Sequence, residues 1–162
     1  MTETPDGARL HLPMPLRWGD LDAFNHVNNV AILKILEEAR IRAFWTPAPG
    51  ESAPPTAVID ATQGAPMMML IARQEIEYHA PIPYHRDPID VQLWFSHMGG
   101  SSVDVCYEVY PPERHVPQVK YVTASATAVV VDADTGAPQR LPAAARAAWE
   151  PYLCAAPTFR RR

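Results

Sequence analysis

The chain has 162 residues, of which 48% are hydrophobic and 20% charged, and its formal net charge is −4. These values are typical of a globular protein with one domain and leave no room for a second independent core. Nucleic-acid binding is not expected, because an acidic chain lacks the clustered Lys and Arg that neutralise phosphates. The one basic run, residues 160–162, is interpreted as a frayed C-terminal tail.

The cysteine content and the N-terminal sequence indicate a cytoplasmic protein. Cys106 and Cys154 are the only cysteines, so reduced thiols are expected rather than a disulfide scaffold. Residues 1–15 are polar and contain prolines, without the apolar centre of a signal peptide. The longest apolar stretch, residues 65–72, is too short to cross a bilayer, and no membrane contact is expected.

Eighteen prolines divide the chain into elements, because proline lacks the N–H donor that a helix interior or a central strand requires. Alternating apolar residues predict a short strand over about residues 8–17. A helix is predicted next. It begins at Asn28 or Asn29, whose side chains suit an N-cap, and its apolar residues recur at helical spacing to about Trp45.

The second half of the chain is predicted to be mainly strands. Alternation and β-branched residues place them at 67–78, 89–98, 102–110 and 119–131, with a short closing helix at 143–149. We expect these four strands to form an antiparallel meander. One long helix among consecutive strands indicates an α+β domain and excludes a doubly wound sheet. One helix cannot cover both faces of five strands, which favours a partner subunit and therefore a dimer.

The most specific pattern spans residues 17–29, which read Arg-Trp-Gly-Asp-Leu-Asp-Ala-Phe-Asn-His-Val-Asn-Asn, and Glu-Glu-Ala-Arg follows at 37–40. With the segment 78–84 and the Gly-Gly-Ser-Ser turn at 99–102, this string resembles the 4-hydroxybenzoyl-CoA thioesterase family and its acyl-CoA thioesterase relatives. The resemblance implies a hotdog fold, an antiparallel sheet of about five strands wrapped around one long central helix. It implies one domain over residues 1–162, with its core at about 8–131 and a short helix and tail at 138–162.

The resemblance also implies roles for individual residues. In that family the second aspartate of the string is the catalytic carboxylate, which is Asp22 here, and a backbone N–H at the start of the central helix polarises the thioester carbonyl, which is that of Asn29 here. His26 matches a histidine in the similar loop of plant acyl-ACP thioesterases. Phe24 stands where those enzymes carry asparagine, which leaves His26 as a helper outside their Asp-Asn-His set.

The chemistry fits these positions. Thioester hydrolysis needs a carboxylate that attacks the carbonyl or deprotonates a water, together with donors that stabilise the developing oxyanion. A helix N-terminus supplies such donors. Asp20 and Asp22 could instead only cap the turn, and Asp20 is interpreted as structural. Glu38 on the helix is the alternative acid, although pairing with Arg42, four residues later, is the simpler interpretation.

Further substrate contacts are predicted at Phe24, Asn25, Ser101 and Ser102, with Arg73, His85 and Arg86 as looser candidates for the CoA phosphates. The histidines and cysteines show no metal-ligand spacing, so neither a metal nor a cofactor is expected.

The sequence therefore predicts an acyl-CoA thioesterase that works as a homodimer or a dimer of dimers, with acyl carrier protein as a possible carrier in place of CoA. Two alternatives stay open, a 3-hydroxyacyl-thioester dehydratase or hydratase of the same fold and a non-catalytic acyl-thioester binding module. The acyl group is not specified.

Overall fold

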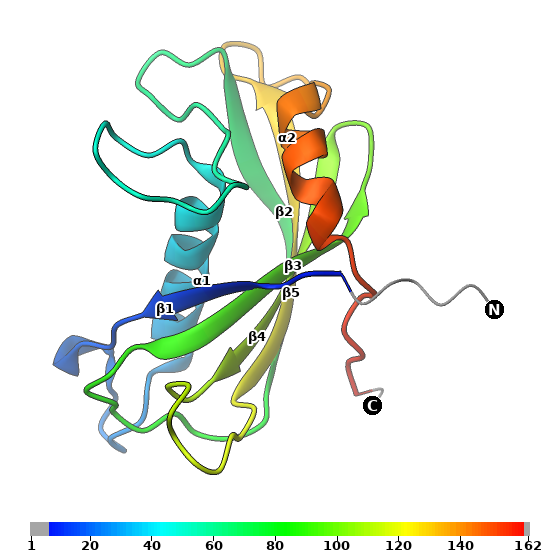
Figure 1. Ribbon diagram of the computed structural model, residues 1–162. Coiled ribbons are helices and arrows are strands. Elements are labelled where there is room, and N and C mark those ends of the chain that lie inside the picture. Colours follow the sequence, from blue (N-terminus) through cyan, green and yellow to red (C-terminus); the bar gives the residue numbers. More distant parts are fainter. Residues whose placement is uncertain (1–6, 161–162) are drawn as a thin grey trace.

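The computed structural model describes residues 7–160. Five strands form one antiparallel sheet in the order β1-β3-β4-β5-β2, and a long helix lies against one face of it (Figure 1). The strands are β1 (Leu10–Met14), β2 (Met67–Tyr78), β3 (Ile89–Met98), β4 (Ser102–Tyr110) and β5 (Val122–Asp132). The helices are α1 (Asn29–Phe44), α2 (Ala143–Trp149) and the short 3-10 turns η1 (Trp18–Asp20) and η2 (Glu150–Tyr152).

Most of the predicted elements are confirmed, but two have different ends. β1 stops at Met14 instead of continuing to Arg17, because the chain turns into η1, where the Asp20 carboxylate accepts the Arg17 N–H at 2.7 Å. β5 begins at Val122, three residues later than expected. The Gly99-Gly100 turn joins β3 to β4 as predicted, and Ser102 O accepts the Gly99 N–H at 2.8 Å.

The prediction of a four-strand meander is wrong for β2. This strand pairs with β5, from Met67 opposite Asp132 to Tyr78 opposite Val122, and only β3, β4 and β5 follow one another across the sheet. The connection from β2 to β3 therefore crosses the width of the sheet and leaves β2 at its edge. β1 occupies the other edge, beside β3.

The core lies between the sheet and α1. The inward side chains of β3 are fully buried, and α1 contributes a stripe at helical spacing: Ile32, Ile35, Leu36, Ala39 and Ala43. α2 closes one end of this core. The Trp149 ring stacks on Phe44 and Phe95 at 4.6 and 5.0 Å, and its indole N–H donates to Thr56 O at 2.8 Å.

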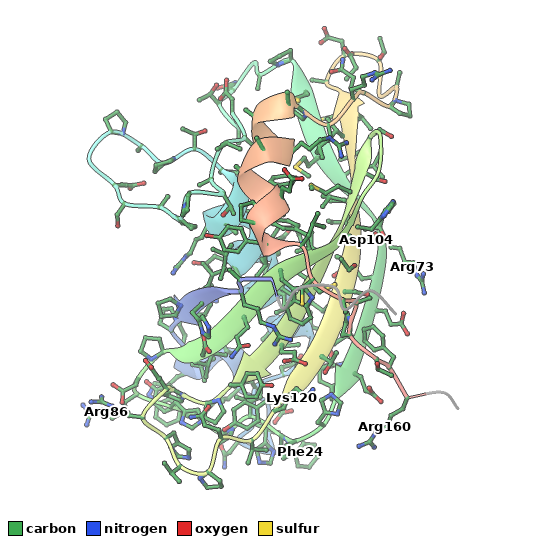
Figure 2. The ribbon with its side chains drawn as sticks, turned by 45° about the vertical axis from the view of Figure 1, so that its right-hand side comes forward. Phe24, Arg73, Arg86, Asp104, Lys120 and Arg160 are labelled. Carbon is green, nitrogen blue, oxygen red and sulfur yellow. The ribbon has the colours of Figure 1, made fainter. Side chains whose placement is uncertain are left out.

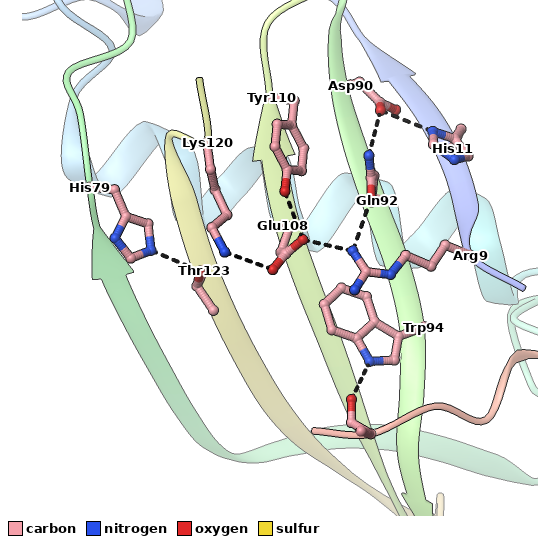
Figure 3. A network of polar contacts seen from close by, with 11 residues as sticks. Arg9, His11, His79, Asp90, Gln92, Trp94, Glu108, Tyr110, Lys120 and Thr123 are labelled. Carbon is pink, nitrogen blue, oxygen red and sulfur yellow. Dashed lines mark hydrogen bonds and ion pairs between the residues drawn. The ribbon is translucent and has the colours of Figure 1, made fainter. Parts of the chain in front are cut away.

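The opposite face of the sheet is polar and hydrogen-bonded (Figure 3). Glu108 is buried there. Burial opposes its ionisation, but hydrogen bonds from Lys120, Arg9 and Tyr110 outweigh that effect and hold the pKa of Glu108 below its usual value. Residues 153–160 also cross this face, where the Trp94 indole donates to the Ala155 carbonyl at 2.9 Å. The sequence predicted a partner subunit on the premise that this face is uncovered. The chain's own C-terminal segment lies on it, so that reason for a partner no longer holds.

The C-terminal basic run lies partly outside the described residues. Arg160 lies 3.7 Å from Glu77 on β2, whereas Arg161 and Arg162, like residues 1–6, are not described. Within residues 7–160, neither α1 nor any other helix has the length and apolar character needed to cross a membrane.

Candidate active site

The aspartate loop is a tight hairpin whose base adjoins the start of α1. Three backbone contacts hold its two sides together. Asp20 O accepts the Asn28 N–H at 2.8 Å, Leu21 and Val27 form a β-bridge, and His26 O accepts the Asp22 N–H at 2.9 Å. Asp20 lies opposite Asn28, the residue before α1, and Asp22 is two residues further along the hairpin. Asp22 is therefore about 7 Å from the start of the helix. The hairpin brings the predicted acid and the predicted oxyanion donor into one region.

The Asp22 carboxylate is held by one oxygen and free at the other. Its Oδ1 accepts the backbone N–H of Phe24 at 2.8 Å and that of His26 at 3.4 Å, which is the turn geometry expected of an Asx residue. Its Oδ2 makes no hydrogen bond to the part of the chain that the structure describes. The residue is half-buried, and the two backbone hydrogen bonds to Oδ1 fix the orientation of the carboxylate.

The neighbouring Asp20 has the structural role that its sequence suggested. It is 5% exposed, and its two carboxylate oxygens accept the Arg17 backbone N–H at 2.7 Å and the Arg17 guanidinium at 3.1 Å. Its backbone carbonyl also holds Asn28. Asp20 therefore fixes the base of the hairpin and has no free oxygen for catalysis.

The start of α1 leaves two N–H groups without an acceptor among residues 7–160, those of Asn29 and Ala31. Asn28 is the N-cap, and its Oδ1 accepts the Val30 N–H at 2.8 Å. The Asn29 N–H, one of those that a helix cannot satisfy internally, has no acceptor among residues 7–160. The Tyr78 hydroxyl donates to Asn29 O at 3.1 Å, and burial raises the pKa of Tyr78, which keeps this donor protonated. Tyr78 thus holds the helix start from the end of β2.

The remaining loop residues lie around the carboxylate. His26 is half-buried, and its ring has no hydrogen-bond partner among the described residues. Phe24 is 80% exposed at the hairpin tip and projects from the lower end of the molecule (Figure 2). Asn25, beside it, has a φ of 60°, the left-handed conformation that asparagine tolerates.

Three predicted residues lie away from Asp22 within this chain. Ser101 lies in the β3–β4 turn and Ser102 begins β4, at the end of the sheet opposite the hairpin, about ten strand steps or 30 Å away. Glu38 lies nine residues into α1, about 13 Å along its axis from Asn29. The Glu38 carboxylate pairs with Arg42 at 2.5 Å, which confirms the expected helical ion pair.

A small cavity of about 250 Å³ adjoins the helix start. It is lined by Tyr78, His79 and five apolar residues from the hairpin, α1 and the segment after β2: Val27, Ile32, Ala80, Pro81 and Ile82. A larger groove of about 1090 Å³ lies beside β1 and contains none of the predicted site residues. In the range 7–160, no cluster of three His, Cys, Asp or Glu side chains is arranged to hold a metal ion.

Sequence reasoning missed Tyr78 and the ring pair Trp18–Tyr84, whose centroids are 4.6 Å apart with planes 10° from parallel. Tyr84 belongs to the segment that pairs with the hairpin, through the Val27 N–H to Ile82 O bond at 2.9 Å and the His26–Pro83 bridge. The partners in these contacts are some 50 to 66 residues apart in the sequence. The motif at 78–84 marked the segment but not its contacts.

Comparison with known proteins assigns the family. The sequence profile of the thioesterase-like superfamily matches residues 16–149. The chain belongs to this superfamily. No curated protein sequence matches the chain. The family match confirms the resemblance drawn from the aspartate loop, and the five-stranded sheet with its central helix is the hotdog fold.

Solved structures agree with the superfamily assignment. The PA2801 protein of Pseudomonas aeruginosa is 28% identical, with a TM-score of 0.70 over 86% of this chain and 95% of that one. A thioesterase of Thermus thermophilus, complexed with coenzyme A and Zn, is 25% identical, with a TM-score of 0.61 over 88% and 90%. A 1,4-dihydroxy-2-naphthoyl-CoA thioesterase of Synechocystis shares the fold, at 14% identity and a TM-score of 0.69 over 87% and 95%.

Proposed function

We propose that the protein hydrolyses acyl-CoA thioesters to the free acid and CoA. The observation that carries this proposal is the pairing of a half-buried carboxylate, with Asp22 Oδ2 unengaged, and an unengaged N–H at the start of α1. Superfamily membership and the coenzyme A complex of a Thermus thermophilus relative support the substrate class. An acyl carrier protein remains the alternative thioester carrier.

In the proposed reaction the thioester carbonyl oxygen faces the Asn29 N–H. The carbonyl carbon is then attacked either by Asp22 itself, which forms an acyl-enzyme anhydride that a water hydrolyses to the free acid and a regenerated Asp22, or by a water that Asp22 deprotonates. Charge developing on the oxygen is stabilised by the Asn29 N–H and by the positive end of α1. The negative charge leaves with the CoA thiolate, which takes up a proton. His26, whose ring has no hydrogen-bond partner among the described residues, is the helper that we propose for that proton.

We infer that the working unit is a homodimer, or a dimer of dimers, built on β2. This edge strand has twelve residues, and Met68 and Leu70 on it are 43% and 49% exposed. Two such edges pair antiparallel around a twofold axis, which brings the start of one β2 beside the end of the other. The apolar segment 67–70 and the β3–β4 turn with Ser101 would then approach the partner's aspartate hairpin.

The decisive experiment compares wild type with Asp22→Asn on a panel of acetyl-, hexanoyl- and benzoyl-CoA, with a thiol reagent that detects free CoA. We expect Asp22→Asn to lower kcat by roughly 10²- to 10⁴-fold, because the general base or nucleophile is lost. Glu38→Gln is the matched control, a carboxylate-to-amide change on α1 that we expect to keep wild-type turnover. Equal melting temperatures show that both variants fold.

Other outcomes separate the alternatives. Turnover that survives in Asp22→Asn and disappears in Glu38→Gln would move the acid onto α1. Interconversion of 3-hydroxyacyl- and enoyl-CoA, followed by ultraviolet absorbance without CoA release, would identify a dehydratase or hydratase. Tight acyl-CoA binding with no turnover would leave a binding module. A cytoplasmic location stays a prediction of the sequence.

A further inference from the structure

Trp18 presents an aromatic face to solvent directly beside the aspartate hairpin. Trp18 is 72% exposed although Tyr84 covers one face of its indole, with ring centroids 4.6 Å apart and planes 10° from parallel. The opposite face of the indole must therefore be the open one. A large flat apolar surface held rigidly in solvent is an unusual feature and serves well as a stacking platform.

The support beneath this platform is fixed. Trp18 lies in η1, whose end is held by the buried Asp20 carboxylate. Tyr84 lies in the segment after β2, which is hydrogen-bonded to the hairpin through Val27 and Ile82. The ring pair lies between two segments that backbone hydrogen bonds already join, so the platform is held in place while the hairpin does not depend on the Trp18 side chain.

Two arginines lie close to Trp18 in the same segments. The Arg17 side chain is 79% exposed and uses one guanidinium nitrogen for Asp20, which leaves its other N–H groups available. Arg86, two residues after Tyr84, is exposed and makes no ion pair to any residue from 7 to 160; it projects from the same lower end of the molecule as Phe24 (Figure 2). The next cation, Arg114, already uses two guanidinium nitrogens on the Asp87 carboxylate, at 2.6 and 3.2 Å, whereas Arg17 uses only one on Asp20.

We propose that the open face of Trp18 stacks the adenine ring of the CoA substrate and that Arg86 and Arg17 bind its phosphates. This inference rests on the proposed function and adds a nucleotide subsite to it. Adenine stacks on aromatic side chains in a way that needs no further hydrogen bonds, and guanidinium groups match phosphate oxygens. Trp18 and Asp22 are four residues apart, at most about 14 Å, a span that the pantetheine arm bridges.

The test compares two substrates that carry the same acyl group, an acyl-CoA and an acyl-N-acetylcysteamine thioester, which lacks the nucleotide. For Trp18→Leu we expect kcat/KM to fall roughly five- to hundredfold on the acyl-CoA and to stay unchanged on the short thioester. Trp18→Phe keeps a stacking face and should retain most of the acyl-CoA activity.

Arg86→Gln should lower kcat/KM on the acyl-CoA only, with a loss that shrinks as salt is added, because charges on the surface are screened. Arg42→Gln, which removes an exposed arginine that pairs with Glu38 on α1, is its control. Equal losses on both substrates in Trp18→Leu would show a structural role and overturn the subsite, as would no loss on either. A loss confined to acyl-(acyl carrier protein) would identify Trp18 as a protein-docking residue and also overturn it.

Binding measurements keep this proposal separate from the proposed function. CoA should quench the fraction of tryptophan fluorescence that Trp18→Phe removes, and pantetheine, which has no adenine, should not. If the wild type hydrolyses neither substrate, the thioesterase proposal fails while this quench still supports the subsite. A quench of equal size in Trp18→Phe would overturn the subsite whatever the activity.

Discussion

The tip of the aspartate hairpin turns on one residue, Asn25, whose φ of 60° is uncommon for side chains with a Cβ. Asparagine tolerates this conformation, whereas a β-branched side chain does not. We expect Asn25→Val to lower the free energy of unfolding by about 1–2 kcal/mol. It should also lower kcat, because the Asn25 N–H donates to Asp22 O at 3.1 Å and strain at the tip displaces the acid.

Thermal unfolding and acyl-CoA turnover measure these two effects. Asn25→Gly is the control, because glycine adopts the same φ without strain, and it should stay close to wild type in both measurements. An Asn25→Val variant as stable as wild type would show that the hairpin relaxes to another conformation at no cost.

From the sequence, only the family resemblance could assign the structural role to Asp20 and the catalytic role to Asp22. Both residues are turn formers, and each accepts a backbone N–H in the structure. The physical difference is that Asp20 is buried with both oxygens engaged, whereas Asp22 keeps one free. That difference depends on how the Arg17 guanidinium folds back over η1, which no local pattern encodes.

The proposed mechanism depends on the first turn of α1. The Asn29 N–H in that turn can be removed by a substitution that leaves the rest of the helix unchanged. Proline at position 29 would lack the N–H, yet proline suits the first position of a helix. Asn28 has φ −60° and ψ 141°, the extended conformation that a following proline requires. We therefore expect Asn29→Pro to fold normally and to lower kcat by roughly 10²- to 10³-fold.

Asn29→Ala is the matched control, because it removes the side chain and keeps the N–H, and its kcat should equal that of wild type. Circular dichroism and melting temperature report whether α1 is intact in both variants. Full turnover in a correctly folded Asn29→Pro would show that the oxyanion donor is another group.

The elements themselves were largely readable from the sequence, since helical and alternating periods come from burial on one side. α1 and α2 begin and end where the apolar spacing and the prolines indicate. The position of β2 was not readable. Its alternation is compatible with either neighbour, and only the tertiary fold decides that β2 pairs with β5 across a long connection. The Tyr78–Asn29 contact depends on that placement, so it could not be predicted either.

For the whole molecule, the polar outer face changes the argument for a dimer. The sequence suggested that a partner covers the second face, but that face holds a buried, fully paired Glu108 and the C-terminal segment. The exposed edge of β2 is the better candidate surface, because unpaired backbone groups and apolar side chains occur together there.

An added charge at this edge tests the pairing. In an antiparallel pair of β2 strands, residues 67–70 lie near the partner strand's end, which contains Glu75 and Glu77, so Leu70→Glu would place like charges together. We expect wild type to have twice the chain mass of 18.0 kDa by light scattering and Leu70→Glu to be monomeric at the same concentration.

Val116→Glu is the control, since Val116 is 86% exposed but lies on the β4–β5 connection and not on the exposed edge of β2, and it should leave the dimer intact. The monomeric variant should also lose acyl-CoA turnover while keeping its folded spectrum, because the proposed acyl contacts at 67–70 come from the partner. A monomeric wild type with full activity would contradict both parts, and the site would then have to be complete within one chain, with the cavity beside Ile32 and Tyr78 as its acyl pocket.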